Sequence, residues 1–386
     1  MSRSTYHIHP LDTLFFKDGK PFSLGEETWA DGIFPPPPSV LTGAFRTAWL
    51  SRELSLLNQL QKGKPIPDWL LNLHLTQVGI TINRKPYLPI PLDLAQPKVR
   101  KMSEKIREKS RGTYRAISSV PLESEAIHSL PDPLSLWGFT ETVEGWDHQL
   151  ISAGEDFSAY LSGNKSQYKS TRSLQEIVKM EAKIGIGRSP LTNSAEDGQL
   201  YRTGMRRMSP RKGDTYSPGF VVEVEGMPDM LQSKPFLIKL GAEGKAARVI
   251  PTQQVEWPHP PATSSVNQFK LIFSTPVFFD NPKHAWLPSW LESDQLSGTL
   301  PGTDIPVQLT AAFTGKPIVL GGWDLVNQRP KPMRNCLPAG TVLHFKFLEQ
   351  QHHSLLSLRE KLPVSLSEND PAQQGFGLYY LGMLAH

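Results

Sequence analysis

The chain has 386 residues, 38% of them hydrophobic, with a mean hydropathy of −0.33 and a net charge of only +4, which favours two water-soluble domains. No apolar run reaches the roughly 18–20 residues of a membrane span, and residues 1–10 contain no stretch of signal-peptide length, so we expect a cytoplasmic protein without membrane contact. The single cysteine, Cys336, excludes internal disulfides and multi-cysteine zinc sites, and we expect it to be a small buried residue.

The first half begins with a predicted strand over 6–16, whose apolar residues alternate and end in aromatics. After a loop rich in glycine and proline, Ser39 is predicted to cap a helix over 40–50. A second strand is expected over 73–82. The prolines of 87–94 confine that segment to a sheet edge or a loop.

Residues 95–170 show the least periodicity, and we expect mobile insertions there. Order returns with 181–188 and with a possible hairpin over 200–225. A strand over 235–240 then leads into a glycine-containing turn over 241–245.

The second half, after a linker near 253–266, opens as the first half does, with an apolar strand that ends in aromatics. Its predicted elements are strands over 269–280, 307–313 and 341–348 and a helix over 354–362. Strand, helix, strands, helix and strand in each half indicates an α+β fold of two ferredoxin-like, RRM-like domains with long loop insertions. We expect one domain over 1–255, with an insertion at about 95–175, and the other over 265–386.

Positive charge is concentrated in three blocks. Residues 98–115 hold eight Lys or Arg against two Glu, residues 202–212 hold five and no acid, and residues 326–347 hold four and no acid. Charge gathered in this way suits a phosphate backbone better than evenly spread charge does. For any single block, a solvated face is the alternative.

Seven segments, in order and spanning most of the chain, resemble the RAMP proteins of type III-B CRISPR effectors, in the family of the third Cmr subunit. They are LDTLFFKDGKPFS (11–23), FPPPPSVLTGAFRTAWL (34–50), YLPIPLDL (87–94), EAKIGIGR (181–188), KLGAEGKAARV (239–249), GGWDLVNQRPKPMRNCLPAG (321–340) and GFGLYYLG (375–382). One departure is KLGAEGK, where the family more often has a second glycine and an arginine. The lysine keeps the positive charge but lacks the bidentate fork of an arginine.

The resemblance implies two ferredoxin-like RAMP domains and a non-catalytic subunit without cofactor or metal. It implies that the chain holds the 5′ repeat-derived tag of a guide RNA. It also implies contact with the large polymerase- or cyclase-like subunit and with the first backbone RAMP subunit. The equivalent position in a type III-A or III-D complex is an alternative.

The candidate RNA contacts combine cations with glycines and one aromatic residue. They are Arg46, Arg188, Arg202, Arg206, Arg207, Gly244, Lys245, Trp323, Arg329, Lys331, Arg334, Gly375 and Gly377. Cations pair with phosphates, glycines permit close backbone approach, and an aromatic ring stacks on an unpaired base. Each has a structural alternative: a salt bridge, a tight turn, packing, or a tryptophan in the core.

Two rival functions come from other classes. Some RAMP relatives cut guide precursors with a general acid–base histidine, and His7, His9, His74 and His284 are the candidates here. We see no further residues that would complete such a site, and His7 with His9 alone does not make a metal site. The other rival is a scaffold that binds protein neighbours and touches RNA incidentally.

Overall fold

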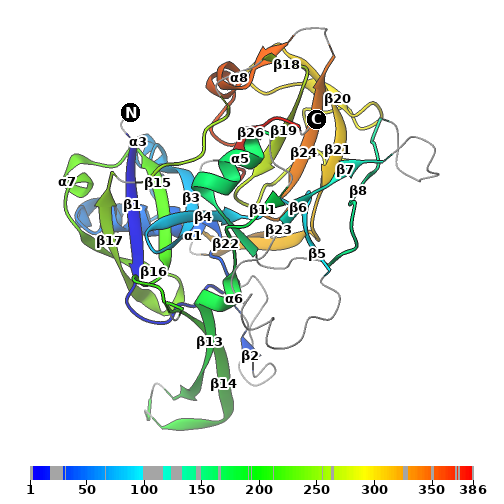
Figure 1. Ribbon diagram of the computed structural model, residues 1–386. Helices are drawn as coiled ribbons and strands as arrows, with labels where there is room; N and C mark the ends of the chain where they lie inside the picture. The colour runs from blue at the N-terminus through cyan, green and yellow to red at the C-terminus, as the bar shows by residue number, and fades with distance from the viewer. Residues whose placement is uncertain are drawn as a thin grey trace.

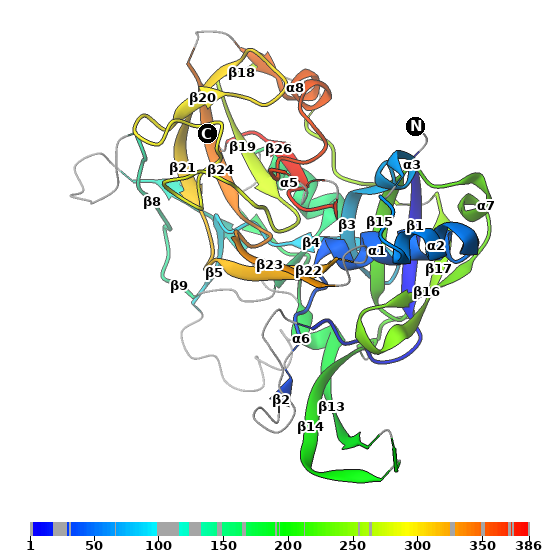
Figure 2. The same ribbon diagram turned by 180° about the vertical axis from the view of Figure 1, so that it is seen from behind.

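Two sheets lie side by side in the computed structural model, and one long hairpin projects from them (Figures 1 and 2). The structure describes residues 3–17, 29–30, 32–65, 67–98, 116–122, 133–144, 149–163, 167–189, 191–192, 194–211, 213–253, 255–261, 265–324, 329–348, 352–369, 372 and 374–384. No helix within these residues is long and apolar enough to cross a bilayer.

The larger sheet has eight strands, and every neighbouring pair in it is antiparallel. The spatial order is β12 (Thr171–Ser173), β10 (Gln149–Ser152), β4 (Lys85–Pro89), β3 (His74–Ile82), β15 (Gly219–Glu225), β1 (Arg3–Pro10), β17 (Lys245–Thr252) and β16 (Phe236–Leu240). Because side chains alternate along a strand, Tyr6 and Ile8 of β1 share one face. The helix α1 (Pro38–Leu50) covers that face with Leu41 and Phe45, which are buried in the same core.

The start of α1 differs from the prediction. The helix begins at Pro38, and Pro37 occupies the position before it, so Ser39 lies inside the first turn and is not the N-cap. No side chain caps this helix end. Proline is suited to a first helical position because its missing N–H has no helical partner there and its φ is already helical. The short helices α2 (Leu54–Gln61) and α3 (Asp68–Leu71) follow.

The smaller sheet has five antiparallel strands and belongs to the second half of the chain. Its order is β20 (Ser297–Thr299), β21 (Pro306–Phe313), β24 (Val342–Phe347), β19 (Gln268–Phe273) and β26 (Tyr379–Gly382). The predicted strands over 307–313 and 341–348 are confirmed to within a residue. The predicted helix over 354–362 is confirmed as α8 (Leu355–Lys361).

The same strand order occurs in both halves. In the first half it is β17-β1-β15-β3, and in the second it is β26-β19-β24-β21, so each set reads fourth, first, third, second in chain order. The two halves differ in which connecting helix is short or missing. The second crossover of the first half has α7 (Asp229–Gln232) as its one α-helix, followed by β16, and the loop between β19 and β20 contains no helix.

Two hairpins stand apart from the main sheets. The longer one pairs β13 (Val178–Arg188) with β14 (Ala195–Met208), and β2 (Trp29–Ala30) runs parallel to β14. The shorter one pairs β22 (Ile318–Asp324) with β23 (Arg329–Cys336). The predicted hairpin over 200–225 is therefore wrong. Residues 195–208 pair with the strand before them, while β15 joins the large sheet between β1 and β3.

Two further expectations fail because distant residues pack together. The segment over 87–94 is not confined to an edge, since β4 lies between β3 and β10. The segment over 95–170 contains ordered elements in its described parts: β10 extends the large sheet, and Tyr160 and Leu161 are fully buried. The remaining residues of that segment, 99–115, 123–132, 145–148 and 164–166, lie outside the described residues.

The small elements complete the fold. They are β5 (Leu94–Pro97), β6 (Ala116–Ser118), β7 (Val120–Pro121), β8 (Trp137–Gly138), β9 (Val143–Glu144), the π-helical turn η1 (Ala153–Phe157), α5 (Ser158–Leu161), β11 (Gln167–Tyr168), α6 (Leu174–Ile177), the 3₁₀ turn η2 (Ala242–Gly244), β18 (Ser265–Val266) and β25 (His353–Ser354).

The two halves share a hydrophobic core. Each half has its own cluster of buried residues, and a third cluster takes Tyr160, Val221 and Trp257 from the first half and Ile272 and Tyr380 from the second. Trp257 belongs to the predicted linker, so this linker is packed into the protein. The shared core joins the halves into one body.

Candidate nucleic-acid interface

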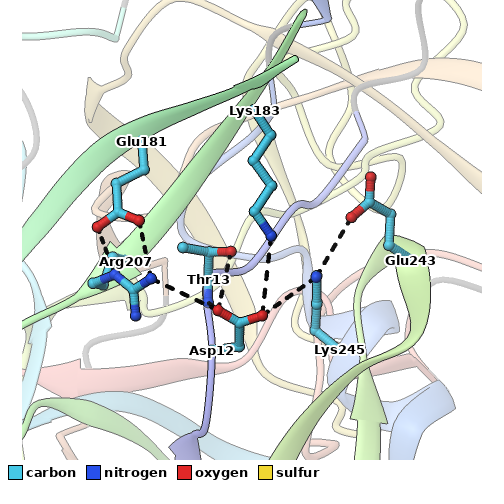
Figure 3. Close-up of polar contacts among 7 residues, drawn as sticks. All are labelled: Asp12, Thr13, Glu181, Lys183, Arg207, Glu243 and Lys245. Carbon is cyan, nitrogen blue, oxygen red and sulfur yellow. Dashed lines mark hydrogen bonds and ion pairs between the residues drawn. The ribbon is translucent and has the colours of Figure 1, made fainter. Parts of the chain in front are cut away.

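One carboxylate gathers three cations at the base of the long hairpin (Figure 3). Asp12 follows β1 and lies 3.3 Å from Lys245 Nζ, 3.7 Å from Arg207 Nη2 and 4.0 Å from Lys183 Nζ. The backbone N–H of Thr13 donates to Asp12 Oδ1 at 2.7 Å. This N–H, with the neighbouring lysines, holds the pKa of Asp12 below its usual range. We call these four charged residues the Asp12 cluster.

Two further carboxylates pair with cations of the Asp12 cluster. Glu181 accepts two bonds from Arg207, at 2.5 and 2.9 Å, in a bidentate pair. Glu243 lies 3.6 Å from Lys245. The three cations thus face three carboxylates, and these half-exposed pairs contribute little to global stability because water still screens them. Their effect is geometric: they connect the loop after β1, the hairpin and the turn before β17.

Backbone bonds reinforce this geometry. The N–H of Leu14 donates to the carbonyl of Arg206 and the N–H of Arg206 donates to the carbonyl of Leu14, both at 2.7 Å. The hairpin is therefore fastened to the large sheet by main chain as well as by charge. Farther along, it projects away from both sheets (Figures 1 and 2).

One face of the projecting hairpin combines arginines with exposed apolar side chains. Arg202 and Arg206 pair with Ile184 and Met180, so these four side chains share a face. Ile184 is 65% exposed and Met180 is 52% exposed, and Arg202 is exposed as well. Arg207 points to the opposite face, into the Asp12 cluster. The side chain of Arg188 lies outside the described residues.

The turn before Lys245 uses its two glycines differently. Both have a positive φ, +77° at Gly241 and +58° at Gly244, which glycine adopts readily. A Cβ on Gly241 would lie 2.5 Å from the carbonyl oxygen of Phe15, so Gly241 is required for packing. A Cβ on Gly244 would meet only the Lys239 side chain, at 3.7 Å, and the residue is exposed. Gly244 leaves its backbone open to a ligand.

The predicted cations on the shorter hairpin divide into two kinds. Arg329 is exposed and pairs across the hairpin with Asp324, whereas Lys331 is half-buried and pairs with Gly322. Arg334 forms an ion pair with Asp280 and lies over the Phe278 ring, 4.9 Å from its centroid. Its guanidinium connects β23 to the loop after β19. The side chain of Trp323 lies outside the described residues.

The structure gives packing roles to three other candidates. Arg46 donates to the carbonyls of Leu71 and Leu73 at 3.0–3.2 Å and connects α1 to the start of β3. Gly375 and Gly377 have positive φ, and a Cβ on Gly377 would lie 2.4 Å from the backbone nitrogen of Ser367. Cys336 is buried as predicted.

The four histidines do not form one site. His7 and His9 are neighbours on β1, with ring centroids 6.0 Å apart. His74 Nδ1 lies 2.8 Å from the carbonyl oxygen of Asn72, and the ring of His284 lies 6.2 Å from that of Trp286. Within the described ranges, no three or more His, Cys, Asp or Glu residues gather in a way that would hold a metal ion.

Sequence reasoning missed the residues that position the hairpin. Asp12, Lys183 and Glu181 lie in two of the segments that carry the family resemblance, but nothing local relates them. The signal in the sequence that could have pointed to the cluster was Asp12, an acidic residue within a segment that resembles the family. Its partners lie roughly 170–230 residues away in sequence.

Comparisons with known proteins identify similar chains and a family. Two solved structures of a type III-B Cmr-beta assembly contain a similar chain, one described as bound to cognate target RNA and AMPPnP and the other as bound to cognate target RNA. The first is 14% identical, with a TM-score of 0.45, and the match covers 88% of this chain and 86% of that one. The second is 15% identical, with a TM-score of 0.43, and the match covers 89% of this chain and 86% of that one. No curated protein matches the chain. The family model for the CRISPR-associated protein Cas_Cmr3 matches residues 6–384, and the chain therefore belongs to that family, as the seven segments predicted.

Proposed function

We propose that this chain is a non-catalytic RNA-binding subunit of a type III-B CRISPR effector complex that anchors the 5′ repeat-derived tag of the guide RNA. In this role it docks the large polymerase- or cyclase-like subunit onto the first backbone RAMP subunit, without cofactor or metal. Family membership supports the complex. The solved relatives are described as bound to RNA.

The observation that carries the proposal is the surface around the long hairpin. Arg202 and Arg206 lie beside exposed apolar side chains on a hairpin that the Asp12 cluster holds in place. Cations bind phosphates, and exposed apolar side chains pack against the faces of unpaired bases. Gly244, at the same end of the sheet as the cluster, adds an accessible backbone. Arg329 and Lys331 on the shorter hairpin offer further cations.

The strand orders support two ferredoxin-like RAMP domains, over 1–255 and 265–386. A β-α-β-β-α-β chain folded into one antiparallel sheet gives the order fourth, first, third, second. Both halves have that order. The second half reaches it without a helix in its first crossover, and the described part of the proposed insertion at about 95–175 adds β10 and β12 to the first sheet.

The test is guide binding by the assembled complex at several salt concentrations. Arg202→Gln with Arg206→Gln, and separately Arg329→Gln with Lys331→Gln, should weaken binding about equally for different tag sequences, because phosphate contacts carry no base information. Each lost contact should make the slope of log K against log salt concentration shallower by up to about 0.7 on single-stranded RNA. Lys283→Gln, which removes an exposed cation from the second half, is the matched control.

Unchanged affinity and salt slope in both double variants, in complexes that assemble normally, would show that these hairpins face protein or solvent, as in a scaffold. The nuclease alternative is tested on the purified chain with guide precursor RNA, with and without divalent metal. Site-specific cleavage that disappears in His7→Ala or His9→Ala would overturn the non-catalytic assignment.

A further inference from the structure

A second group of basic side chains lies on the large sheet, on the face opposite α1. His7 and His9 alternate with Tyr6 and Ile8, so they point away from the helix-covered core. His9 pairs with Arg248 on β17, which places both side chains on the same face. On β15 the residue next to His9 is Gly219, so no side chain stands beside His9 there.

Arg84 lies in the turn between β3 and β4, three residues after Thr81, which pairs with Gly219, the neighbour of His9. From this turn its charge acts on both histidines, and its backbone is held in place. Asn83 and Arg84 both have positive φ, +51° and +65°, as a tight two-residue hairpin turn requires. The Asn83 side chain donates to Asp214 at 3.0 Å and accepts from the N–H groups of Thr215 and Tyr216 at 2.9 and 3.2 Å. Arg84 lies over the Tyr216 ring, 4.0 Å from its centroid.

The charges in this group are not compensated among the described residues. Neither Arg84 nor Arg248 forms an ion pair with a described carboxylate, although both are exposed. Asp214 is engaged by Asn83 and by the N–H of Arg211, and Glu223, on the same face, is engaged by Arg3 and Thr76. Like charges held close together without a counterion are unfavourable, and a bound anion relieves them.

The two histidines also lie in surroundings that disfavour positive charge. His7 is buried and its Nδ1 has no hydrogen-bond partner among the described residues, which is unusual for a buried polar atom. Burial, His9 and Arg84 lower the pKa of His7 to about 4. Burial, Arg84 and Arg248 lower the pKa of His9, which is half-buried. Both imidazoles are therefore neutral at pH 7.

We propose that Arg84, Arg248 and His9 form a binding site for a phosphate group, with His7 lying behind His9. The two arginines supply the fixed charge, and His9 is a donor that gains a proton when the phosphate arrives. Two flanking arginines disfavour a metal cation at the same histidines. Only the source of the phosphate, an RNA backbone, rests on the proposed function; the site itself does not.

The test uses the purified full chain with histidines labelled at Cε1 and the pH titration of His9 followed by NMR. His9→Gln assigns the signal. Inorganic phosphate, and separately a short single-stranded RNA, should raise the pKa of His9 by about 1 pH unit or more, because an anion within about 4–6 Å favours the imidazolium. Arg84→Gln and Arg248→Gln should each reduce that rise by at least half, while Lys283→Gln leaves it unchanged.

A rise with RNA and phosphate supports an RNA-backbone site, and a rise with inorganic phosphate alone supports a site for free phosphate. No rise with either, or a rise that both arginine variants retain, overturns the proposal. Because no complex assembly is needed, this result is independent of the guide-binding test. The Arg84 variant is checked by far-ultraviolet circular dichroism, and Arg248→Gln, on a regular strand, keeps the test decisive if Arg84→Gln disturbs the turn.

Discussion

The ammonium group of Lys270 lies 3.3 Å from the centre of the Tyr160 ring, inside the protein. Lys270 comes from β19 of the second half and Tyr160 from α5 of the first. The Tyr160 hydroxyl donates to Asp93 Oδ1 at 2.7 Å, and Asp93 Oδ2 lies 3.9 Å from Lys270 Nζ. His344 Nε2 is 3.8 Å from the same oxygen. A buried charge pair with a cation–π contact thus connects the two halves.

The contribution of Lys270 to stability should rise between about pH 8 and pH 10.5. Burial lowers the pKa of Lys270 in the folded protein to about 8, from 10.5 in the unfolded chain. Between these values the unfolded chain binds more protons at this residue, so its contribution to the free energy of unfolding increases with pH, by roughly 2–3 kcal/mol. Buried tyrosines and Cys336, whose pKa values burial raises, act in the opposite direction, so urea unfolding at pH 7.5, 9 and 10 compares the protein with Lys270→Met. The difference in free energy of unfolding between the two should shift by this amount in favour of Lys270, and a difference that is constant with pH would contradict the prediction.

Removing the central carboxylate of the Asp12 cluster should loosen the long hairpin. In Asp12→Asn, Lys183, Arg207 and Lys245 keep their charges but lose the group that they share. We expect faster amide hydrogen exchange at the base of β13 and β14, with little change in the melting temperature, since these pairs are half-exposed and screened by water. Asp294→Asn, which breaks the isolated pair with Lys283, is the control. Unchanged exchange at the hairpin would show that the backbone bonds alone hold it.

Two glycines with similar backbone angles should respond differently to alanine. Gly377 and Gly244 have φ of +65° and +58°. At Gly377 the new methyl would lie 2.4 Å from the Ser367 nitrogen, whereas at Gly244 it meets only a side chain at 3.7 Å. Gly244→Ala should cost about 1–2 kcal/mol from backbone strain alone. Gly377→Ala should cost at least about 1 kcal/mol more, because the backbone must also shift. Equal losses in thermal unfolding would contradict this.

Arg46 should be important for stability and not for guide binding. Arg46→Gln removes the bonds to the carbonyls of Leu71 and Leu73, which are partly buried. Leaving such acceptors without donors costs about 1–3 kcal/mol in the free energy of unfolding. Chemical denaturation measures this loss, and anisotropy on the assembled complex measures guide affinity. Reduced affinity at unchanged stability would instead favour the RNA contact that the sequence predicts.

Local patterns predicted most of the regular elements. Alternation along β3, β21 and β24 and the helical spacing of α1 are short-range signals, and the structure confirms them. Pairing is long-range, and there the sequence was insufficient. The partner of 195–208 was misassigned, and β10 was not recognised, because the hydrogen-bond partners of a strand are not encoded in the strand itself.

The site shows the same division. Basic blocks and glycines marked Arg202, Arg206 and Lys245, and these residues do lie at or near one hairpin. What local sequence does not show is which cations already have partners. Lys245, Arg207 and Arg334 are engaged by acids from distant segments, whereas Arg202 is exposed and pairs across its hairpin with Ile184. Charge counting alone treats the two kinds as equal.

The core shared by the two halves has a consequence for synthesis. Val221 and Trp257 leave the ribosome long before Tyr380, in the last described strand, which completes the same cluster. Until β26 has emerged, that apolar surface stays exposed to solvent, so an interrupted chain would present exposed hydrophobic side chains to chaperones and proteases. Only chains translated through β26 should escape this surveillance and be available for incorporation into a ribonucleoprotein.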